Sequence, residues 1–335
     1  MQDDVRDITI IGGGPTGLFG AFYAGLRGMS TRIIDSLPEL GGQLMALYPE
    51  KYVFDVGGFP KILAKDLAKD MISQGTQFDP DVLLDEEVRE LETEDDHFVL
   101  RCRGGEYATR SVLIAGGKGA FEPRHLKVPG YDELLGKGIY YAVKDPDDYI
   151  GKKVLLVGGG DSALDWALAL KDRAEQLTMV HRRDGFRAHE ASIDQLHEAA
   201  AKGDVDLRTF HEVREIRGNG SVDGATIYDN RTDEDSDLEV DAVLCFLGFK
   251  PDLGPIKSWG LELDKNRIVV SQLMETSTAG IYAAGDLVSY PGKIDLIATG
   301  YAEAAIAVNN AAHYLDPEAR VNPGHSTNLA LFKDK

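Results

Sequence analysis

Cysteine is scarce in this sequence, which has only Cys102 and Cys245 among its 335 residues. The two lie far apart, each inside an apolar run typical of a strand, so a disulfide framework is not expected. The histidines are scattered, and no group of residues has the spacing of metal ligands. We therefore expect two buried, unreactive thiols and no metal centre.

Positive charge is also in short supply, since 36 lysines and arginines stand against 56 aspartates and glutamates, a formal net charge of −20. Nucleic acids and anionic membranes are themselves polyanions, so neither is an expected partner. No apolar run approaches the roughly 18 residues that a membrane-spanning helix needs. The first residues, Met-Gln-Asp-Asp, are acidic and lack the basic and apolar regions of a signal peptide. The sequence therefore predicts a cytoplasmic protein that binds no membrane.

Glycine is abundant, with 37 residues, and many glycines follow short apolar runs. These runs occupy residues 8–11, 112–115, 154–157, 242–247 and 281–284. Short continuous apolar runs that end at glycine and lead into a helical pattern are typical of buried parallel strands. The pattern predicts an α/β fold.

A strand–glycine–helix unit occurs twice, around residues 12–17 and 158–163. Such a repeat predicts two Rossmann-like domains, each built in three layers with ββα order. Two segments with glycine and proline then serve as linkers between them. The first domain would comprise residues 1–117 and 249–335, and the second, residues 118–248, would be inserted into it.

Other stretches depart from the parallel pattern. Residues 76–105 and 207–240 have short alternating runs and charged turns, which predict antiparallel β-ribbons. The charged tract 232–237 reads as a turn. The alanine-rich stretch from about residue 295 to 314 predicts a long helix.

The first glycine motif reads Gly-Gly-Gly-Pro-Thr-Gly at residues 12–17, directly after a strand and at the start of a helix. Glycines let the turn tighten and let a pyrophosphate approach the backbone, while the helix N-terminus offers free N–H groups. Asp35 ends the next strand, where a carboxylate can accept hydrogen bonds from ribose hydroxyls. Together Gly14 and Asp35 predict a dinucleotide site.

The second motif reads Gly-Gly-Gly-Asp-Ser-Ala at residues 158–163, and the strand that follows it ends without an acid. Basic residues take that place. A carboxylate would repel the 2′-phosphate of NADPH, whereas guanidinium groups bind it in fork geometry. The second site should therefore prefer NADPH to NADH. Its expected contacts to the nucleotide are Gly160, Asp161, Ser162, Arg182, Arg183 and Arg187.

A third motif, Gly285-Asp286, follows a buried strand and precedes the alanine-rich helix. Asp286 can bond the ribityl hydroxyls of a flavin, and the positive end of the helix, near residues 296–299, can face the flavin ring. The first dinucleotide site has an acidic residue where the ribose would bind, and the second has basic residues there. This difference indicates that one chain binds both FAD and NADPH. Hydride transfer from nicotinamide to flavin N5 needs no protein acid or base, so we expect no catalytic residue in that sense.

These motifs, in this order and together with the Gly-Gly-Gln at residues 41–43, resemble those of the low-molecular-weight thioredoxin reductases over nearly the whole chain. Those enzymes carry a Cys-x-x-Cys pair just before the second glycine motif. In the matching stretch, residues 140–145, Tyr141 and Lys144 stand where the cysteines would be. Neither can form a disulfide, so a thiol–disulfide relay through that site is chemically impossible. The thioredoxin-reductase-like ferredoxin–NADP(+) reductases share this departure, and the sequence resembles that subgroup.

The subgroup resemblance implies how a flavin is held. Tyr48, in a Leu-Tyr-Pro sequence, would stack on one face of the ring. In the extension after the long helix, His325 would cover the opposite face and Thr327 would bond near the ring, from their own subunit or from the second subunit of a homodimer. Further FAD contacts implied by the resemblance are Thr16, Gln43, Val88 through its backbone, Phe121 and Asp286.

The resemblance implies electron transfer between NADPH and ferredoxin or flavodoxin, with a domain rotation that brings the nicotinamide to the flavin. Three alternatives stay open: an NADPH diaphorase or quinone reductase, a flavin-binding regulator without turnover, and a thiol-related reductase. The arginines argue against the regulator, and Thr16 argues against reductases that carry a cysteine inside the first glycine motif. An acidic ferredoxin would need a local cationic surface, for which the candidates are Lys51, Lys61, Lys65 and Lys69.

Overall fold

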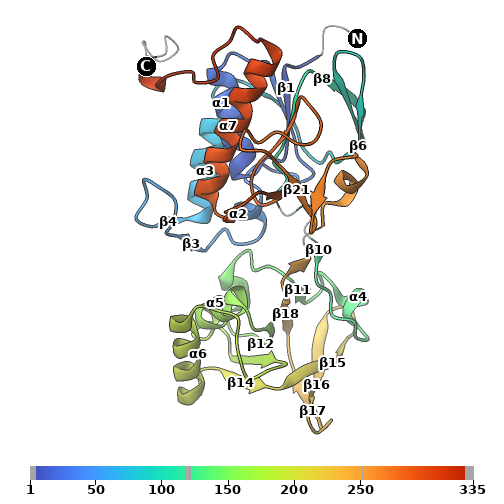
Figure 1. Ribbon diagram of the computed structural model, residues 1–335. Coiled ribbons are helices and arrows are strands. Elements are labelled where there is room, and N and C mark those ends of the chain that lie inside the picture. Colours follow the sequence, from blue (N-terminus) through green and yellow to red (C-terminus); the bar gives the residue numbers. More distant parts are fainter. Residues whose placement is uncertain (1–4, 118, 120–121, 251, 329–335) are drawn as a thin grey trace. The chain divides into compact units, whose positions relative to one another are not determined.

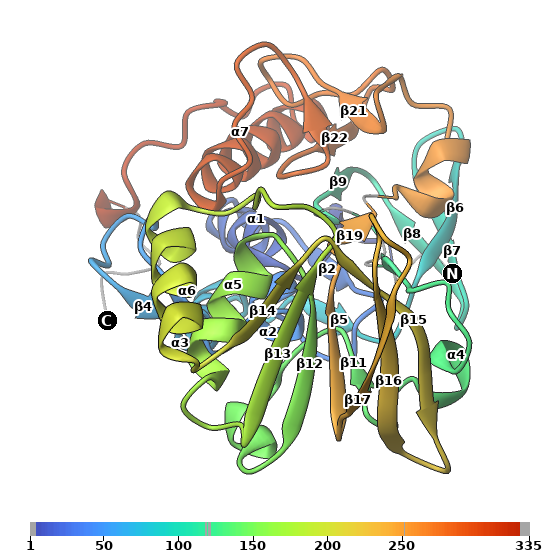
Figure 2. The ribbon, with the colours of Figure 1, turned by 90° about the horizontal axis from the view of Figure 1, so that it is seen from below.

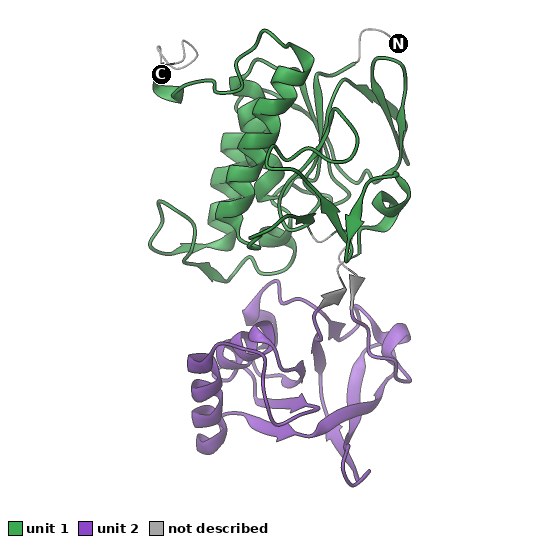
Figure 3. Ribbon diagram, in the orientation of Figure 1, with its two compact units in different colours: residues 1–121, 251–335 green, residues 122–250 purple. Residues whose placement is uncertain are grey.

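The structure of the chain is a computed structural model that describes residues 5–117, 119, 122–250 and 252–328 (Figure 1). The chain divides into two compact units (Figure 3). Unit 1 comprises residues 1–121 and 251–335, and unit 2 comprises residues 122–250. Unit 2 therefore interrupts unit 1 in the sequence, and both boundaries lie a few residues after the domain limits expected at 117 and 248.

Unit 1 is built on a parallel five-stranded sheet. Its strands, in spatial order, are β22 (Ile281–Ala283), β9 (Val112–Ile114), β1 (Ile8–Ile11), β2 (Thr31–Ile34) and β5 (Asp81–Leu83). The first four are almost entirely buried, because layers on both faces exclude water from both rows of side chains. The expectation of an antiparallel ribbon over residues 76–105 is wrong for β5, whose short apolar run pairs in parallel with β2.

Three long helices cover one face of this sheet, namely α1 (Pro15–Leu26), α3 (Ala64–Gly75) and α7 (Ile297–Leu315) (Figure 1). Pro15 is the first residue of α1, where its fixed φ suits a helix start. Gly20 lets α1 approach the sheet closely, since a Cβ there would lie 2.7 Å from the Leu113 side chain on β9. The predicted helix near residues 295–314 is confirmed as α7.

An antiparallel sheet covers the other face of the parallel sheet. It consists of β6 (Val88–Thr93), β7 (Phe98–Cys102) and β8 (Glu106–Thr109). Phe98 and Leu100 are buried in the core of the unit. The remaining short elements of unit 1 are α2 (Gln43–Ala46), β3 (Tyr52–Val53), β4 (Ile62–Leu63), η3 (Gly254–Ser258), β20 (Leu263–Asp264), β21 (Arg267–Val269), β23 (Val288–Ser289) and η4 (Ser326–Asn328).

Unit 2 repeats the same three layers. Its parallel strands, in spatial order, are β11 (Ile139–Tyr140), β18 (Ala242–Phe246), β12 (Lys153–Gly158), β13 (Gln176–His181) and β14 (Asp206–Thr209). Helices α5 (Asp161–Leu170) and α6 (Glu190–Lys202) cover one face (Figure 2). The other elements are β10 (Glu122–Pro123), α4 (Tyr131–Leu134), η2 (Pro146–Tyr149), β15 (His211–Gly218), β16 (Val222–Asp229), β17 (Asp235–Glu239) and β19 (Phe249–Lys250). The predicted α/β fold with two Rossmann-like units is confirmed.

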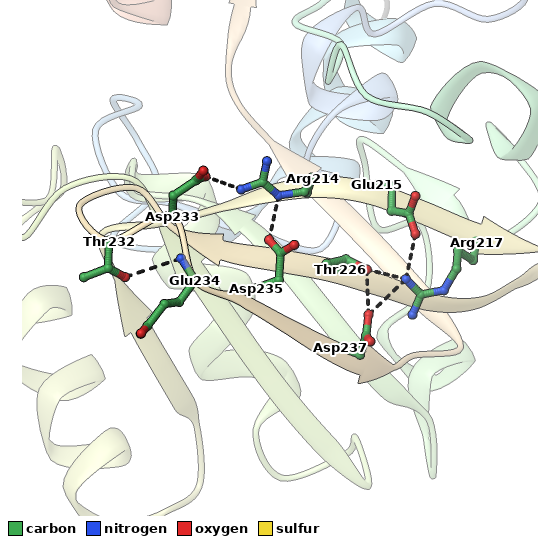
Figure 4. Close-up of polar contacts among 9 residues, drawn as sticks. All are labelled: Arg214, Glu215, Arg217, Thr226, Thr232, Asp233, Glu234, Asp235 and Asp237. Atoms are coloured by element: carbon green, nitrogen blue, oxygen red, sulfur yellow. Dashed lines mark hydrogen bonds and ion pairs between the residues drawn. The ribbon is translucent and has the colours of Figure 1, made fainter.

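The charged tract of residues 232–237, expected as a turn, lies partly in strand β17 (Figure 4). Arginines on β15 make this possible. Arg214 donates to Asp235 at 2.6 Å and also pairs with Asp233, while Arg217 pairs with Asp237 at 3.2 Å. Neutralising these carboxylates lets an acidic segment join a sheet edge, although exposed pairs of this kind each contribute only about 0–1 kcal/mol. In the part of the chain that the structure describes, no helix is long and apolar enough to cross a membrane.

Candidate functional site

The first glycine turn joins β1 to α1 and has no room for side chains. Gly12 has φ +110°, and a Cβ there would lie 2.5 Å from the carbonyl oxygen of Ala115. A Cβ on Gly17 would lie 1.8 Å from the carbonyl oxygen of Gly12, so the first turn of α1 rests directly on the loop. Only glycine permits both contacts, and they place the loop directly against the N-terminal end of α1, whose first N–H groups have no partner within the helix.

Asp35 lies against this turn from the end of β2. Its Oδ2 accepts a hydrogen bond from the Gly13 N–H at 2.5 Å, and its Oδ1 accepts one from the Leu37 N–H at 2.8 Å. Burial raises the pKa of the Asp35 carboxyl, against the opposing effect of these two backbone bonds. Each oxygen retains a further lone pair, so the side chain can still accept a hydrogen bond from a ribose hydroxyl.

The Gly-Gly-Gln loop docks onto the same turn. The Gly41 N–H donates to the Gly13 carbonyl oxygen at 2.9 Å. Gly42 comes so close to Gly14 that a Cβ on Gly42 would lie 2.8 Å from the Gly14 Cα. Gln43 begins α2 directly after this contact, so the structure brings Gln43 and Gly14 together.

Thr16 joins the first motif to the third. Its Oγ1 lies 3.0 Å from the position of a Cβ on Gly285 and 2.3 Å from that of a Cβ on Gly300. The side chain therefore sits between the turn before Asp286 and the first residues of α7. The N-terminal ends of α1 and α7 meet at one place in unit 1.

Tyr48 belongs to the same region. Burial, together with the negative charges of Asp286 and Asp55, raises the pKa of Tyr48 to about 12. The negative charge of Asp286 therefore acts on the Tyr48 hydroxyl, although the two residues are far apart in the sequence.

One buried network at this site was not foreseen from the sequence. Glu303 in α7 is 2% exposed. Its Oε2 accepts a hydrogen bond from the Gly285 N–H at 2.7 Å. Its Oε1 accepts one from the Tyr290 hydroxyl at 2.6 Å and one from Lys293 Nζ at 2.7 Å. The one feature of the sequence that could have pointed to Glu303 is that it is a single glutamate inside an otherwise alanine-rich helix.

The remaining predicted flavin contacts have different outcomes. Val88 begins β6, two residues after Glu86, whose N–H donates to the Asp35 carbonyl oxygen at 3.0 Å. Phe121 lies outside the described residues. His325 and Thr327 are exposed, and the segment that carries them lies at the end of α7 opposite α2 (Figure 1). The structure therefore does not bring these two residues to the Tyr48 region of their own chain.

The second glycine turn joins β12 to α5 in unit 2, and the loop after β13 closes over it. The Arg187 N–H donates to the Gly159 carbonyl oxygen at 2.8 Å, and the His189 N–H donates to Asp161 Oδ1 at 2.9 Å. His181 packs so closely that a Cβ on Gly159 would lie 2.2 Å from its ring. Asp161 thus holds the loop in place beside Gly160, the N-cap of α5.

The three arginines of this loop are exposed around the second turn. None of Arg182, Arg183 and Arg187 forms an ion pair with any residue that the structure describes. Burial lowers the pKa of His181, and the positive charges of Arg182 and Arg183 lower it as well. The His181 ring stacks on Phe186 with centroids 5.0 Å apart. The loop that closes over the turn therefore carries three exposed guanidinium groups, the kind of side chain that binds an anion by charge-assisted hydrogen bonds.

Neither cysteine is placed for redox chemistry. Cys245 is buried, whereas Cys102 is only half-buried, which corrects the expectation that both are fully buried. Burial raises the pKa of each thiol to about 12. Tyr141 and Lys144, at the positions matched to the missing dithiol, are both exposed.

At least three of the four candidate lysines for an acidic partner, Lys51, Lys61 and Lys65, are engaged locally. Lys65 Nζ pairs with Glu50 at 2.7 Å. Lys61 Nζ lies 3.7 Å from the centroid of the Tyr52 ring. A docking surface built from these lysines stays a prediction.

Comparison with known proteins decides the family. The family model of the pyridine nucleotide-disulphide oxidoreductases matches residues 6–311. The ferredoxin–NADP reductase of Thermus thermophilus is 51% identical over 331 residues, 98% of this chain and 99% of that relative. The chain belongs to this family, in its ferredoxin–NADP reductase branch. The resemblance predicted from the motifs is therefore confirmed.

Other relatives agree with this placement. Ferredoxin–NADP reductase 1 of Sulfolobus acidocaldarius is 49% identical over 327 residues, 96% of this chain and 98% of the relative. Among solved structures, T. acidophilum thioredoxin reductase has a TM-score of 0.78 and 28% identity, covering 94% of this chain and 99% of that one. This ferredoxin–NADP reductase thus shares the thioredoxin reductase fold and lacks the Cys-x-x-Cys pair.

Proposed function

We propose that the chain transfers electrons between NADPH and ferredoxin through an FAD held by unit 1. The observation that carries the proposal is the opposite charge beside the two glycine turns. Asp35 lies at the first turn, and the exposed arginines lie around the second. An acid suits the ribose of FAD, and guanidinium groups suit the 2′-phosphate of NADPH.

The residues of unit 1 fit FAD. The start of α1, directly after Gly14, would hold the pyrophosphate, because the first N–H groups of a helix have no partner within it and Gly14 carries no Cβ. Asp35 would bind the ribose and Asp286 the ribityl hydroxyls. Tyr48, whose hydroxyl is influenced by the charge of Asp286, would stack on the ring. Bound FAD would supply the ability to accept two electrons from NADPH and to release them singly.

Further residues complete this proposed site. Gln43 and Thr16 would contact FAD from the loop and helix that adjoin the first turn, and Val88 would do so through its backbone beside the adenine. We also propose that Phe121 contributes, as the resemblance implies. These roles rest on position and on the family, and binding measurements on single variants test each of them.

Unit 2 would bind NADPH at the second turn. Gly160 and Ser162 would face the pyrophosphate, and the arginines Arg182, Arg183 and Arg187 would hold the 2′-phosphate. Asp161 would act indirectly. It accepts a hydrogen bond from the His189 N–H and so keeps the loop that carries the three arginines over the turn. A loop held in place in advance loses less conformational entropy when the nucleotide binds.

The electrons must leave to an external acceptor, because Tyr141 and Lys144 replace the dithiol. The relatives at about half identity over nearly the full chain are named ferredoxin–NADP reductases, and this supports ferredoxin as that acceptor. Flavodoxin is a second one-electron carrier that the same chemistry would serve.

We further propose that the chain is a homodimer in which His325 and Thr327 cover the flavin of the partner subunit. The position of their segment, at the end of α7 away from α2, supports this arrangement over coverage within one chain (Figure 1). Arg27 holds the start of that segment, since its Nη1 donates to the Arg320 carbonyl oxygen at 2.8 Å.

Steady-state kinetics test the proposal. The purified chain should carry FAD and oxidise NADPH far faster than NADH, with ferredoxin as acceptor. Flavodoxin, thioredoxin and a quinone serve as comparison acceptors. Equal rates with NADH would contradict the arginine assignment. A quinone rate above the ferredoxin rate would identify a diaphorase instead.

A further inference from the structure

The buried carboxylate of Glu303 is unusual in what it binds. It accepts three hydrogen bonds, from the Gly285 N–H, the Tyr290 hydroxyl and Lys293 Nζ. The Lys293 and Glu303 side chains are only 6% and 3% exposed. A charge pair so deeply buried is costly unless its hydrogen bonds are satisfied, so the network must hold something in place to be worth its desolvation.

We infer that Glu303 is a positioning residue of the FAD site, holding the Gly285–Asp286 turn so that Asp286 faces the ribityl chain. The inference rests on the proposed function. Gly285 directly precedes Asp286 and has φ +90°. Thr16 contacts the turn from the side of α1, and Glu303 binds its N–H from α7. The orientation of the Gly285 peptide sets the direction in which the next side chain leaves the backbone.

The two oxygens of the carboxylate have separate tasks. Oε2 faces the Gly285 N–H, and Oε1 faces the hydroxyl of Tyr290 and the ammonium of Lys293. All three partners are donors, so both oxygens must accept. A glutamine at this position has one oxygen and one NH₂ group, and its NH₂ would necessarily point at a donor. The negative charge is therefore required by the pattern of donors, and Lys293 compensates that charge.

A purely structural role would be to brace the loop between β23 and α7. That loop already has a brace, because Arg267 on β21 binds Asp295 through two hydrogen bonds of 2.8 and 2.6 Å. This pair is partly exposed, and its hydrogen bonds are separate from those of Glu303. Asp295→Asn thus loosens the same loop while leaving the Glu303 contacts intact, and it serves as the matched control.

The double variant Lys293→Met/Glu303→Gln separates the two roles further. With the ammonium removed, the glutamine oxygen can accept from the Gly285 N–H while its NH₂ donates to the Tyr290 oxygen. The hold on the turn is then restored without any charge. If the ion pair served only to brace the loop, removing both charges would not restore the FAD affinity that Glu303→Gln loses.

The experiment measures the dissociation constant of FAD from the apoprotein by quenching of FAD fluorescence, alongside the melting temperature of each apoprotein. We expect Glu303→Gln to weaken FAD binding by about tenfold or more, and the double variant to return within about threefold of the unmodified chain. We expect Asp295→Asn to stay within about twofold, because an exposed pair contributes little.

Unchanged FAD affinity in Glu303→Gln would overturn the inference, whatever its melting temperature. If that variant does not fold, the double variant decides, and FAD binding weakened by about tenfold or more there would equally overturn it. An unmodified apoprotein that binds no FAD would instead sink the proposed function, so the two failures are distinguishable.

Discussion

The backbone N–H of Gly13 donates a hydrogen bond to Oδ2 of Asp35 at 2.5 Å, which ties the end of β2 to the turn after β1. The same carboxylate accepts from the Leu37 N–H. One side chain thereby sets the shape of the turn and stands where the ribose would bind. Structure and recognition at the first site are therefore coupled.

Asp35→Asn should weaken FAD binding by about tenfold to a hundredfold, because an amide offers one acceptor oxygen where two N–H donors converge. Titration of the apoprotein with FAD measures this effect. Asp70→Asn is the control, since Asp70 is an exposed acid on α3. Equal affinity in Asp35→Asn and the unmodified chain would refute the ribose assignment.

Arg182, Arg183 and Arg187 should carry the preference for NADPH. Replacing any one with alanine should raise the KM for NADPH by about tenfold to a hundredfold and leave that for NADH nearly unchanged, as expected for a lost charge-assisted bond to phosphate. Arg173→Ala provides the control, because Arg173 is an exposed arginine of unit 2 whose Nε lies 3.2 Å from Asp147. A parallel rise for both nucleotides would point to a general loss of the fold instead.

Tyr48 should matter for its ring and not for its hydroxyl. Tyr48→Phe should bind FAD within about twofold of the unmodified chain, while Tyr48→Ala should bind about threefold to tenfold more weakly, since an aromatic stack contributes about 0.5–1.5 kcal/mol. Flavin fluorescence should increase in the alanine variant as quenching by the ring is lost. Tyr52→Ala, at an exposed tyrosine nearby in the chain, should change neither property. The stacking role fails if Tyr48→Ala matches that control.

The two thiols should be nearly inert in the folded chain. Burial raises the pKa of Cys102 and of Cys245 to about 12, so the thiolate fraction at pH 8 should be about 10⁻⁴ against about 0.2 for a free thiol. Alkylation by iodoacetamide, followed by mass spectrometry, should label neither thiol at pH 8 and both in urea. Rapid labelling of the native chain would contradict this environment.

The same pKa values fix the sign of a stability effect. The folded pKa lies above the unfolded value of about 8.5, so the stabilising contribution of the neutral thiols is complete below about pH 8.5. It is lost as the pH rises toward about 12. Replacing both cysteines with alanine should therefore reduce the fall in the free energy of unfolding between pH 8 and pH 10. Urea unfolding at the two pH values measures this fall.

Truncation after Arg320 should expose the flavin and leave the fold intact, because Arg27 still binds the Arg320 carbonyl oxygen. Quenching of bound flavin fluorescence by iodide measures the exposure. A mixed dimer then tests coverage by the partner, with one truncated subunit and one full-length subunit that carries Asp35→Asn. Protection of the flavin in the truncated subunit is the expected result, and exposure equal to that of the truncated homodimer would contradict it.

Local pattern was enough to predict the five buried parallel strands that end near glycine, the glycine turns and α7, because each depends on residues close in sequence. Asp35 could also be assigned, since it ends the strand after the first motif. Glu303 could not, because its donors lie 10 to 18 residues before it in the loops around β23, and only the fold turns that segment back onto α7. Strand β17 was misread as a turn because its acids are neutralised by Arg214 and Arg217, which lie on another strand.

The central claim is that electrons from NADPH pass through one flavin directly to an external one-electron carrier. The most direct test is anaerobic mixing of the FAD-loaded chain and limiting NADPH with a one-electron ferredoxin or with oxidised thioredoxin, followed by absorbance. The account predicts two reduced ferredoxins for each NADPH consumed and no thiols formed on thioredoxin. Reduction of the thioredoxin disulfide, or NADPH oxidation that leaves ferredoxin oxidised, would contradict it.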